Sequence, residues 1–191
     1  MKNKVDIVRS IYLFYVSLTG VIFLIVGLIK TTNALTSIYY PGTEIWYNKY
    51  FYFKDLYEGI VMTFLGLIIF LFHWYFIVKE KRLGKISDIQ YESSMNFFEA
   101  IFFYLLCYVG ITIFIISSIN LVSGFYNINY PPPVIDESGK IIKESTPYVT
   151  KDIGKIIRSI ISMIIGFITF LIGFIRVQLS MKKIEKQEIN T

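Results

Sequence analysis

Four long apolar stretches, separated by polar segments, dominate the pattern of residues along the chain. They cover residues 8–30, 56–78, 97–119 and 156–178 and hold few charges. Each is about 23 residues long, and at a helical rise of about 1.5 Å per residue this length spans a hydrocarbon core of about 30 Å. The two-residue alternation of a membrane β-strand is absent. The pattern therefore predicts an all-α integral membrane protein with four transmembrane helices.

Small residues recur every seven positions along the four stretches. This spacing keeps them on one face of a helix in a left-handed bundle, where small side chains let helix backbones approach closely. The glycines that we expect at helix contacts are Gly20, Gly27, Gly59, Gly66, Gly110, Gly166 and Gly173. His73 is the next member of the Gly59 and Gly66 series, so we expect it to face another helix rather than lipid.

The two halves of the chain are similar to each other. Residues 9–42 align with residues 99–132 at an offset of 90, which places Tyr40-Pro41 on Tyr130-Pro131. Residues 58–82 align with residues 158–182 at an offset of 100. We interpret this as two helical-hairpin repeats, residues 8–82 and 97–182, within one membrane domain of residues 1–191. Both hairpins would enter from the same side, as parallel repeats about an axis along the membrane normal. Apolar composition shared by chance is the alternative.

The charge pattern predicts how the chain lies in the membrane. With both termini inside, the inner segments hold 11 Lys and Arg residues and the outer segments hold 8. Because positive residues favour the cytoplasmic side, we expect cytoplasmic N- and C-termini in a prokaryotic cytoplasmic membrane. The net charge of +5 flanks membrane segments, where attraction to anionic lipid accounts for it. The lipid bilayer is thus a predicted partner, and nucleic acid is not.

The sequence holds no recognisable catalytic constellation. A Ser-His-acid triad or a Cys-His pair would have to use the single histidine, His73, or the single cysteine, Cys107. These two residues lie at different depths on different predicted helices. No Gly-rich phosphate loop follows a strand, and one cysteine cannot form a thiolate metal cluster. We therefore expect no enzymatic activity, no catalytic residue, no bound metal and no cofactor.

His73 has one structural interpretation and two functional ones. It lies six residues before Lys79, or about 9 Å inside the inner boundary of the membrane. A neutral imidazole there can form a hydrogen bond across helices, and we expect the partner to be Tyr12, Tyr104 or Glu99. The functional alternatives are an axial haem ligand or a proton relay.

Four charges near the helix ends occupy equivalent positions in the two halves. Arg9 aligns with Glu99 at the inner ends, and Glu58 aligns with Arg158 at the outer ends. Opposite charges at equivalent positions predict the ion pairs Arg9–Glu99 and Glu58–Arg158 between the halves. Independent snorkelling of each side chain to the nearest headgroups is the alternative.

The two outer loops are expected to be structured. The first holds eight aromatic residues between Tyr39 and Phe53, a composition typical of a segment at headgroup depth. A fold over the outer mouth of the bundle, shielding a lipid or quinone site, is the alternative. The second contains "PPVIDESGKIIKE", which predicts a small β-hairpin around residues 137–139.

Two segments, "RSIYLFYVSLTGVIFLIVGL" and "GLIIFLFHWYF", resemble a family of prokaryotic membrane domains catalogued only as a domain of unknown function. That family opens with Arg-x-x-Tyr, continues through a Gly-containing helix and closes a later helix with His-Trp. The matching residues are Arg9, Tyr12, Gly20, His73 and Trp74. The second half departs from this pattern, with Glu99 for the arginine and Gly173-Phe174 for His-Trp. The resemblance implies four helices and no particular activity.

The sequence therefore predicts a polytopic membrane protein with a non-catalytic role. It would act as a subunit, an anchor or a self-associating scaffold in a larger membrane assembly, with other proteins or further copies of itself as partners. The alternative is a small haem- or quinone-associated electron-transfer subunit, in which His73 would bind the cofactor.

Overall fold

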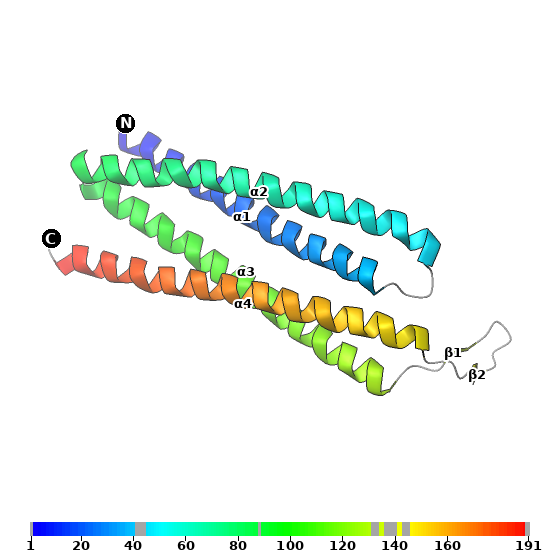
Figure 1. The fold of residues 1–191 in the computed structure, drawn as a ribbon. Helices are drawn as coiled ribbons and strands as arrows, with labels where there is room; N and C mark the ends of the chain where they lie inside the picture. The colour runs from blue at the N-terminus through cyan, green and yellow to red at the C-terminus, as the bar shows by residue number, and fades with distance from the viewer. Residues whose placement is uncertain are drawn as a thin grey trace.

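The protein is a set of four long helices in the computed structural model (Figure 1). The helices are α1 (Lys2–Tyr39), α2 (Ile45–Ser87), α3 (Ile89–Asn129) and α4 (Thr146–Ile189). The structure describes residues 2–40, 45–87, 89–130, 134–135, 141–142 and 146–189, and it describes side chains within 7–40, 50–82, 95–130 and 153–182.

Each helix contains a segment long and apolar enough to cross a membrane. These segments are Ile7–Tyr39, Tyr50–Arg82, Met95–Asn129 and Ile153–Lys182. Each contains one of the predicted stretches and extends past it, because helical hydrogen bonding continues beyond the last apolar residue. The prediction of an all-α integral membrane protein with four spans is confirmed by length and composition.

The helices pack as two hairpins. α1 packs along α2, and α3 packs along α4, while contacts between the hairpins are much fewer and come mainly from α1 against α3 and α4. The two termini lie at one end of the molecule, and the α1–α2 and α3–α4 connections lie at the other (Figure 1). We call these the terminal end and the loop end. Both hairpins thus start and finish at the terminal end.

Glycines bring α1 and α2 into backbone contact. A Cβ atom added to Gly20 would lie 2.8 Å from the backbone N of Phe70 and 3.1 Å from the carbonyl O of Gly66. One added to Gly27 would lie 2.8 Å from the carbonyl O of Gly59. These separations are too short for a side chain, so the two helices can approach this closely only through glycine.

The second hairpin is built in the same way. A Cβ atom on Gly110 would lie 2.8 Å from the carbonyl O of Gly166, and one on Gly166 would lie 2.7 Å from the backbone N of Phe114. One on Gly173 would lie 2.8 Å from Sγ of Cys107. All seven glycines singled out in the sequence therefore lie where the two helices of one hairpin touch.

The hairpins meet through an apolar core in the half of the molecule nearer the terminal end. The ring centroid of Phe102 lies 6.0 Å from that of Phe14 and 5.7 Å from that of Trp74, which joins α3 to α1 and α2. Met95 and Ile77 are almost fully buried in the same cluster. Toward the loop end this cluster is replaced by a polar cleft.

The loop end differs in part from expectation. Strands β1 (Val134–Ile135) and β2 (Ile141–Ile142) pair antiparallel, with Val134 opposite Ile142, so the predicted hairpin is confirmed; its turn, residues 136–140, lies outside the described residues. In the first connection α2 already begins at Ile45. Most of the aromatic segment is therefore helix rather than loop, since one helix continues from the span through these residues. Side chains 41–49 lie outside the description.

Candidate functional site

A polar cleft lies between the two hairpins in the half nearer the loop end. Its volume is about 510 Å³, and α1, α3 and α4 contribute its walls. The lining residues are Ile29, Asn33, Ile113, Ile116, Ser117, Asn120, Lys155, Arg158, Ser159 and Ser162. Within each hairpin the two helices pack closely along their length. The hairpins contact each other mainly through the apolar cluster nearer the terminal end, which leaves the cleft between them nearer the loop end.

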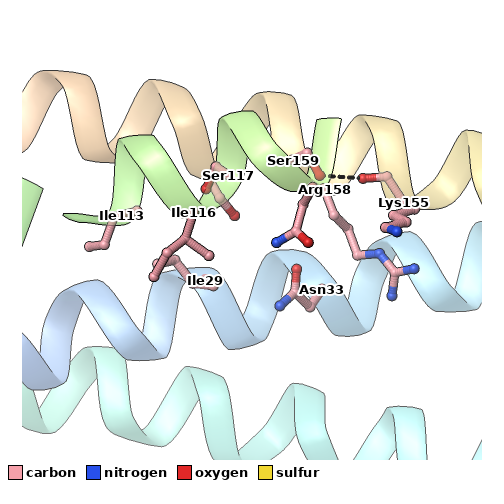
Figure 2. A pocket seen from close by; sticks show the side chains of 10 residues that line it. Ile29, Asn33, Ile113, Ile116, Ser117, Lys155, Arg158 and Ser159 are labelled. Carbon is pink, nitrogen blue, oxygen red and sulfur yellow. Dashed lines mark hydrogen bonds between the residues drawn. The ribbon is translucent and has the colours of Figure 1, made fainter. Parts of the chain in front are cut away.

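Arg158 and Lys155 supply the positive charge of the cleft. The Arg158 side chain extends from α4 toward α1 (Figure 2), where it meets Ser37, while Lys155 reaches Ser123 on α3. Asn33 enters the cleft from α1 (Figure 2). Arg158 donates from Nε to the carbonyl O of Gly154 at 3.2 Å and from Nη1 to the hydroxyl of Ser37 at 3.0 Å. An arginine has five N–H groups, so three of those on Arg158 have no acceptor among the described residues.

Lys155, Asn33 and Asn120 also have hydrogen-bonding capacity that no described residue satisfies. Lys155 donates one of its three N–H groups, to the hydroxyl of Ser123 at 2.8 Å. The side-chain amides of Asn33 and Asn120 form no hydrogen bond with any described residue. The cleft therefore presents several free donors on three helices.

No carboxylate among the described residues balances the two cations. Among the described side chains, the acidic groups at the loop end lie on α2 and pair with α1: Lys30 binds Glu58, and its Nζ lies 3.2 Å from the carboxylate of Asp55. The side chain of Asp152, on α4, lies outside the described residues. The predicted Glu58–Arg158 pair is therefore wrong. Glu58 pairs with Lys30 within the first hairpin, and Arg158 bridges the hairpins by donating to the hydroxyl of Ser37.

The predicted Arg9–Glu99 pair at the terminal end is also wrong. Glu99 binds Lys81 of α2, which also donates to the side chain of Asn96 at 3.1 Å. Nε of Arg9 lies 2.6 Å from the carboxylate of Glu80. Arg9 and Glu99 therefore each pair with a residue of α2, because the last turns of α2 lie beside both α1 and α3. The alignment of the two repeats did not indicate these partners.

His73 lies on the side of α2 that faces α1. Its ring meets that of Tyr12 edge-on, with centroids 6.0 Å apart, so it faces a helix as expected. The expected hydrogen bond to Tyr12, Tyr104 or Glu99 is wrong, since Nδ1 lies 2.8 Å from the carbonyl O of Ile69 on its own helix. A carbonyl only accepts, so Nδ1 is the donor in this hydrogen bond, and in the neutral imidazole the lone pair is then on Nε2.

Sequence reasoning missed the cleft, although it named Arg158. The signal was the position of other polar residues: Asn120 directly follows the third apolar stretch, Asn33 lies three residues after the first, and Lys155 directly precedes the fourth. Three helices thus place polar residues at one depth. That these polar residues line one common cleft is visible only in the structure, where the hairpins are separated at this depth.

The described residues contain no group of three or more His, Cys, Asp or Glu side chains placed to hold a metal ion. Comparison with protein-family models, curated proteins and solved structures finds no match to the chain. The charges, the exposed side chains and the cleft are therefore the features of this protein that bear on its function.

Proposed function

We propose that the protein is a non-catalytic membrane subunit, anchor or self-associating scaffold that binds protein partners through its spans. The observation that supports this is on α3. Tyr108 is the middle residue of the apolar stretch 97–119 and is 68% exposed. Tyr104, one turn away on the same face, is also exposed.

A phenol at this depth needs a partner. The hydroxyl of Tyr108 forms no hydrogen bond with the described part of the chain. From the middle of a core about 30 Å thick it cannot reach the headgroups, and an unpaired hydroxyl in hydrocarbon is costly. A polar group on the helix of another subunit would satisfy it, as in other helix contacts within membranes.

Purification in a mild detergent, followed by mass spectrometry of co-purifying chains and measurement of the complex mass, tests this proposal. We expect the wild type to carry a further chain or a second copy, and Tyr108→Phe to reduce its recovery. Tyr126→Phe is the matched control, because Tyr126 is similarly exposed but lies near the end of α3. A wild-type protein that runs only as a monomer without partners would contradict the proposal.

The hairpin geometry supports the duplication that we propose for this chain. The contact of Gly20 with Gly66 and Phe70 has its counterpart in the contact of Gly110 with Gly166 and Phe170, at offsets of 90 and 100. Superposition of the hairpins by a rotation about an axis in the membrane plane would contradict parallel repeats.

We also propose cytoplasmic termini, on the distribution of Lys and Arg. Position 85, near the end of α2, would then be cytoplasmic. Labelling of Lys85→Cys by an impermeant thiol reagent from outside intact cells would contradict this topology.

Haem or quinone binding is the second candidate, and the tautomer of His73 favours it. Since Nδ1 is engaged by the carbonyl O of Ile69, Nε2 is the nitrogen with a free lone pair, which is how second partners orient metal-binding histidines. One chain offers a single histidine, so ligation by two histidines would need a second copy.

The variant His73→Ala separates these two candidates. If His73 only packs against Tyr12, its loss should lower the free energy of unfolding by about 0.5–1.5 kcal/mol, the usual contribution of such an aromatic pair, and leave the visible absorption spectrum unchanged. A haem absorption band in the wild type that disappears in His73→Ala would instead establish the electron-transfer candidate. Thermal unfolding and absorption spectra of the same preparations provide both readouts.

A further inference from the structure

We propose that the cleft between the hairpins binds the phosphate group of an anionic phospholipid. The inference is independent of the proposed protein partners, because it rests on residues of α1, α3 and α4 and not on the exposed face of Tyr108. It follows from the charge of the cleft, its depth in the membrane and the arrangement of its polar and apolar walls.

The charge of the cleft selects an anion. Arg158 and Lys155 form no ion pair with a described carboxylate, and an anionic partner stabilises cations at the edge of hydrocarbon. The free N–H groups of Arg158 form a planar fork that matches two phosphate oxygens. The ammonium of Lys155, on α4, and the amide of Asn33, on α1, line the same cleft (Figure 2) and supply further donors.

The depth of these donors matches that of a lipid phosphate. Arg158 lies two residues inside the fourth apolar stretch, which begins at residue 156, or about 3 Å along the helix. Asn120 and Asn33 lie just beyond the ends of the third and first stretches. The donors are therefore grouped where the hydrocarbon core gives way to the headgroup layer.

The deeper part of the cleft contains apolar side chains that favour an amphiphile over a free ion. Ile29, Ile113 and Ile116 line it together with the small hydroxyl groups of Ser117 and Ser162, and all five residues lie inside the apolar stretches. Inorganic phosphate has nothing to gain from such a wall. An acyl chain can lie along it while the phosphate meets Arg158 and Lys155.

Native mass spectrometry of the full chain with defined lipids tests this inference. The probes are phosphatidylglycerol, phosphatidylcholine and inorganic phosphate, added separately to protein stripped of lipid. We expect saturable binding of phosphatidylglycerol that is stronger than binding of phosphatidylcholine and is not displaced by millimolar phosphate. Arg158→Gln and Lys155→Gln should each weaken it by about tenfold or more, as expected for loss of a charge-assisted hydrogen bond.

Arg176→Gln is the matched control, since Arg176 is exposed on the same helix near the terminal end and should leave phosphatidylglycerol binding unchanged. Lys155→Gln provides a second test if Arg158→Gln fails to fold, because among the described residues Lys155 makes one side-chain hydrogen bond, to Ser123 of α3. Equal binding by all three variants and the wild type, or equal binding of both lipids, would overturn the inference. Efficient displacement by inorganic phosphate would show a free-anion site and overturn the assignment to lipid.

Discussion

Gly66→Ala is expected to destabilise the first hairpin by about 1–3 kcal/mol, the usual cost of overpacking. A Cβ atom at this position would lie 2.7 Å from the carbonyl O of Gly20 and 2.9 Å from Cα of Leu24. Both are backbone atoms, so the clash is relieved only if α1 and α2 move apart. Because Gly27 and Gly59 join these helices at one further contact, the separation would spread along the hairpin. Thermal unfolding in detergent, followed by circular dichroism, measures the loss.

Gly124→Ala is the matched control for this experiment. A Cβ atom there would lie 2.8 Å from Cγ1 of the Ile156 side chain, while the nearest backbone atom is 3.7 Å away. A side chain can rotate, so the cost should be clearly smaller. Both substitutions gain the same helix propensity, about 0.8–1 kcal/mol, so the difference between them reports packing. Equal destabilisation of the two variants would contradict the role of the backbone contact.

Lys81→Met is expected to be the most destabilising single change at the terminal end, by about 3–5 kcal/mol. Its partner Glu99 is only 8% exposed, and the two form an ion pair between α2 and α3. Removal of the lysine leaves a buried carboxylate with no cation, which carries most of the cost of breaking a buried pair. Chemical denaturation in mixed micelles measures this change in the free energy of unfolding.

The double variant Lys81→Met/Glu99→Leu tests the cause. Because it removes both charges, it should recover most of the stability that Lys81→Met loses. Glu58→Gln provides a contrast, since the pair of Glu58 with Lys30 is exposed at the loop end and should contribute little. If the double variant is as unstable as Lys81→Met, the ion pair is not the source of the effect.

The spans and the hairpin contacts were predictable from local patterns. Runs of about 23 apolar residues determine that four helices cross the membrane, because an unpaired backbone in hydrocarbon is too costly for other structures. The seven-residue spacing of glycines such as Gly20 and Gly66 marks the face where helices touch. Both features depend on periodicity along one helix, which a sequence displays directly.

The charge partners were not predictable in this way. Arg9 and Glu99 were expected to pair because they occupy equivalent repeat positions, yet each binds a residue in the last turns of α2. Long charged side chains pair with whatever lies within a few ångströms, so the outcome depends on the rotation and tilt of each helix. The same dependence redirected the hydrogen bond of His73 to its own helix.

The sequence by itself therefore determined the number of spans, their faces of close contact and the depth of each polar residue, because these follow from helical rise and periodicity. The tertiary structure alone decided which helices pack together in the core and which helices line the cleft. Its core holds the two hairpins together near Phe102, and toward the loop end they enclose the cleft of Arg158 and Lys155. That separation depends on packing between segments more than a hundred residues apart, such as Ser37 and Arg158, and no local pattern encodes it.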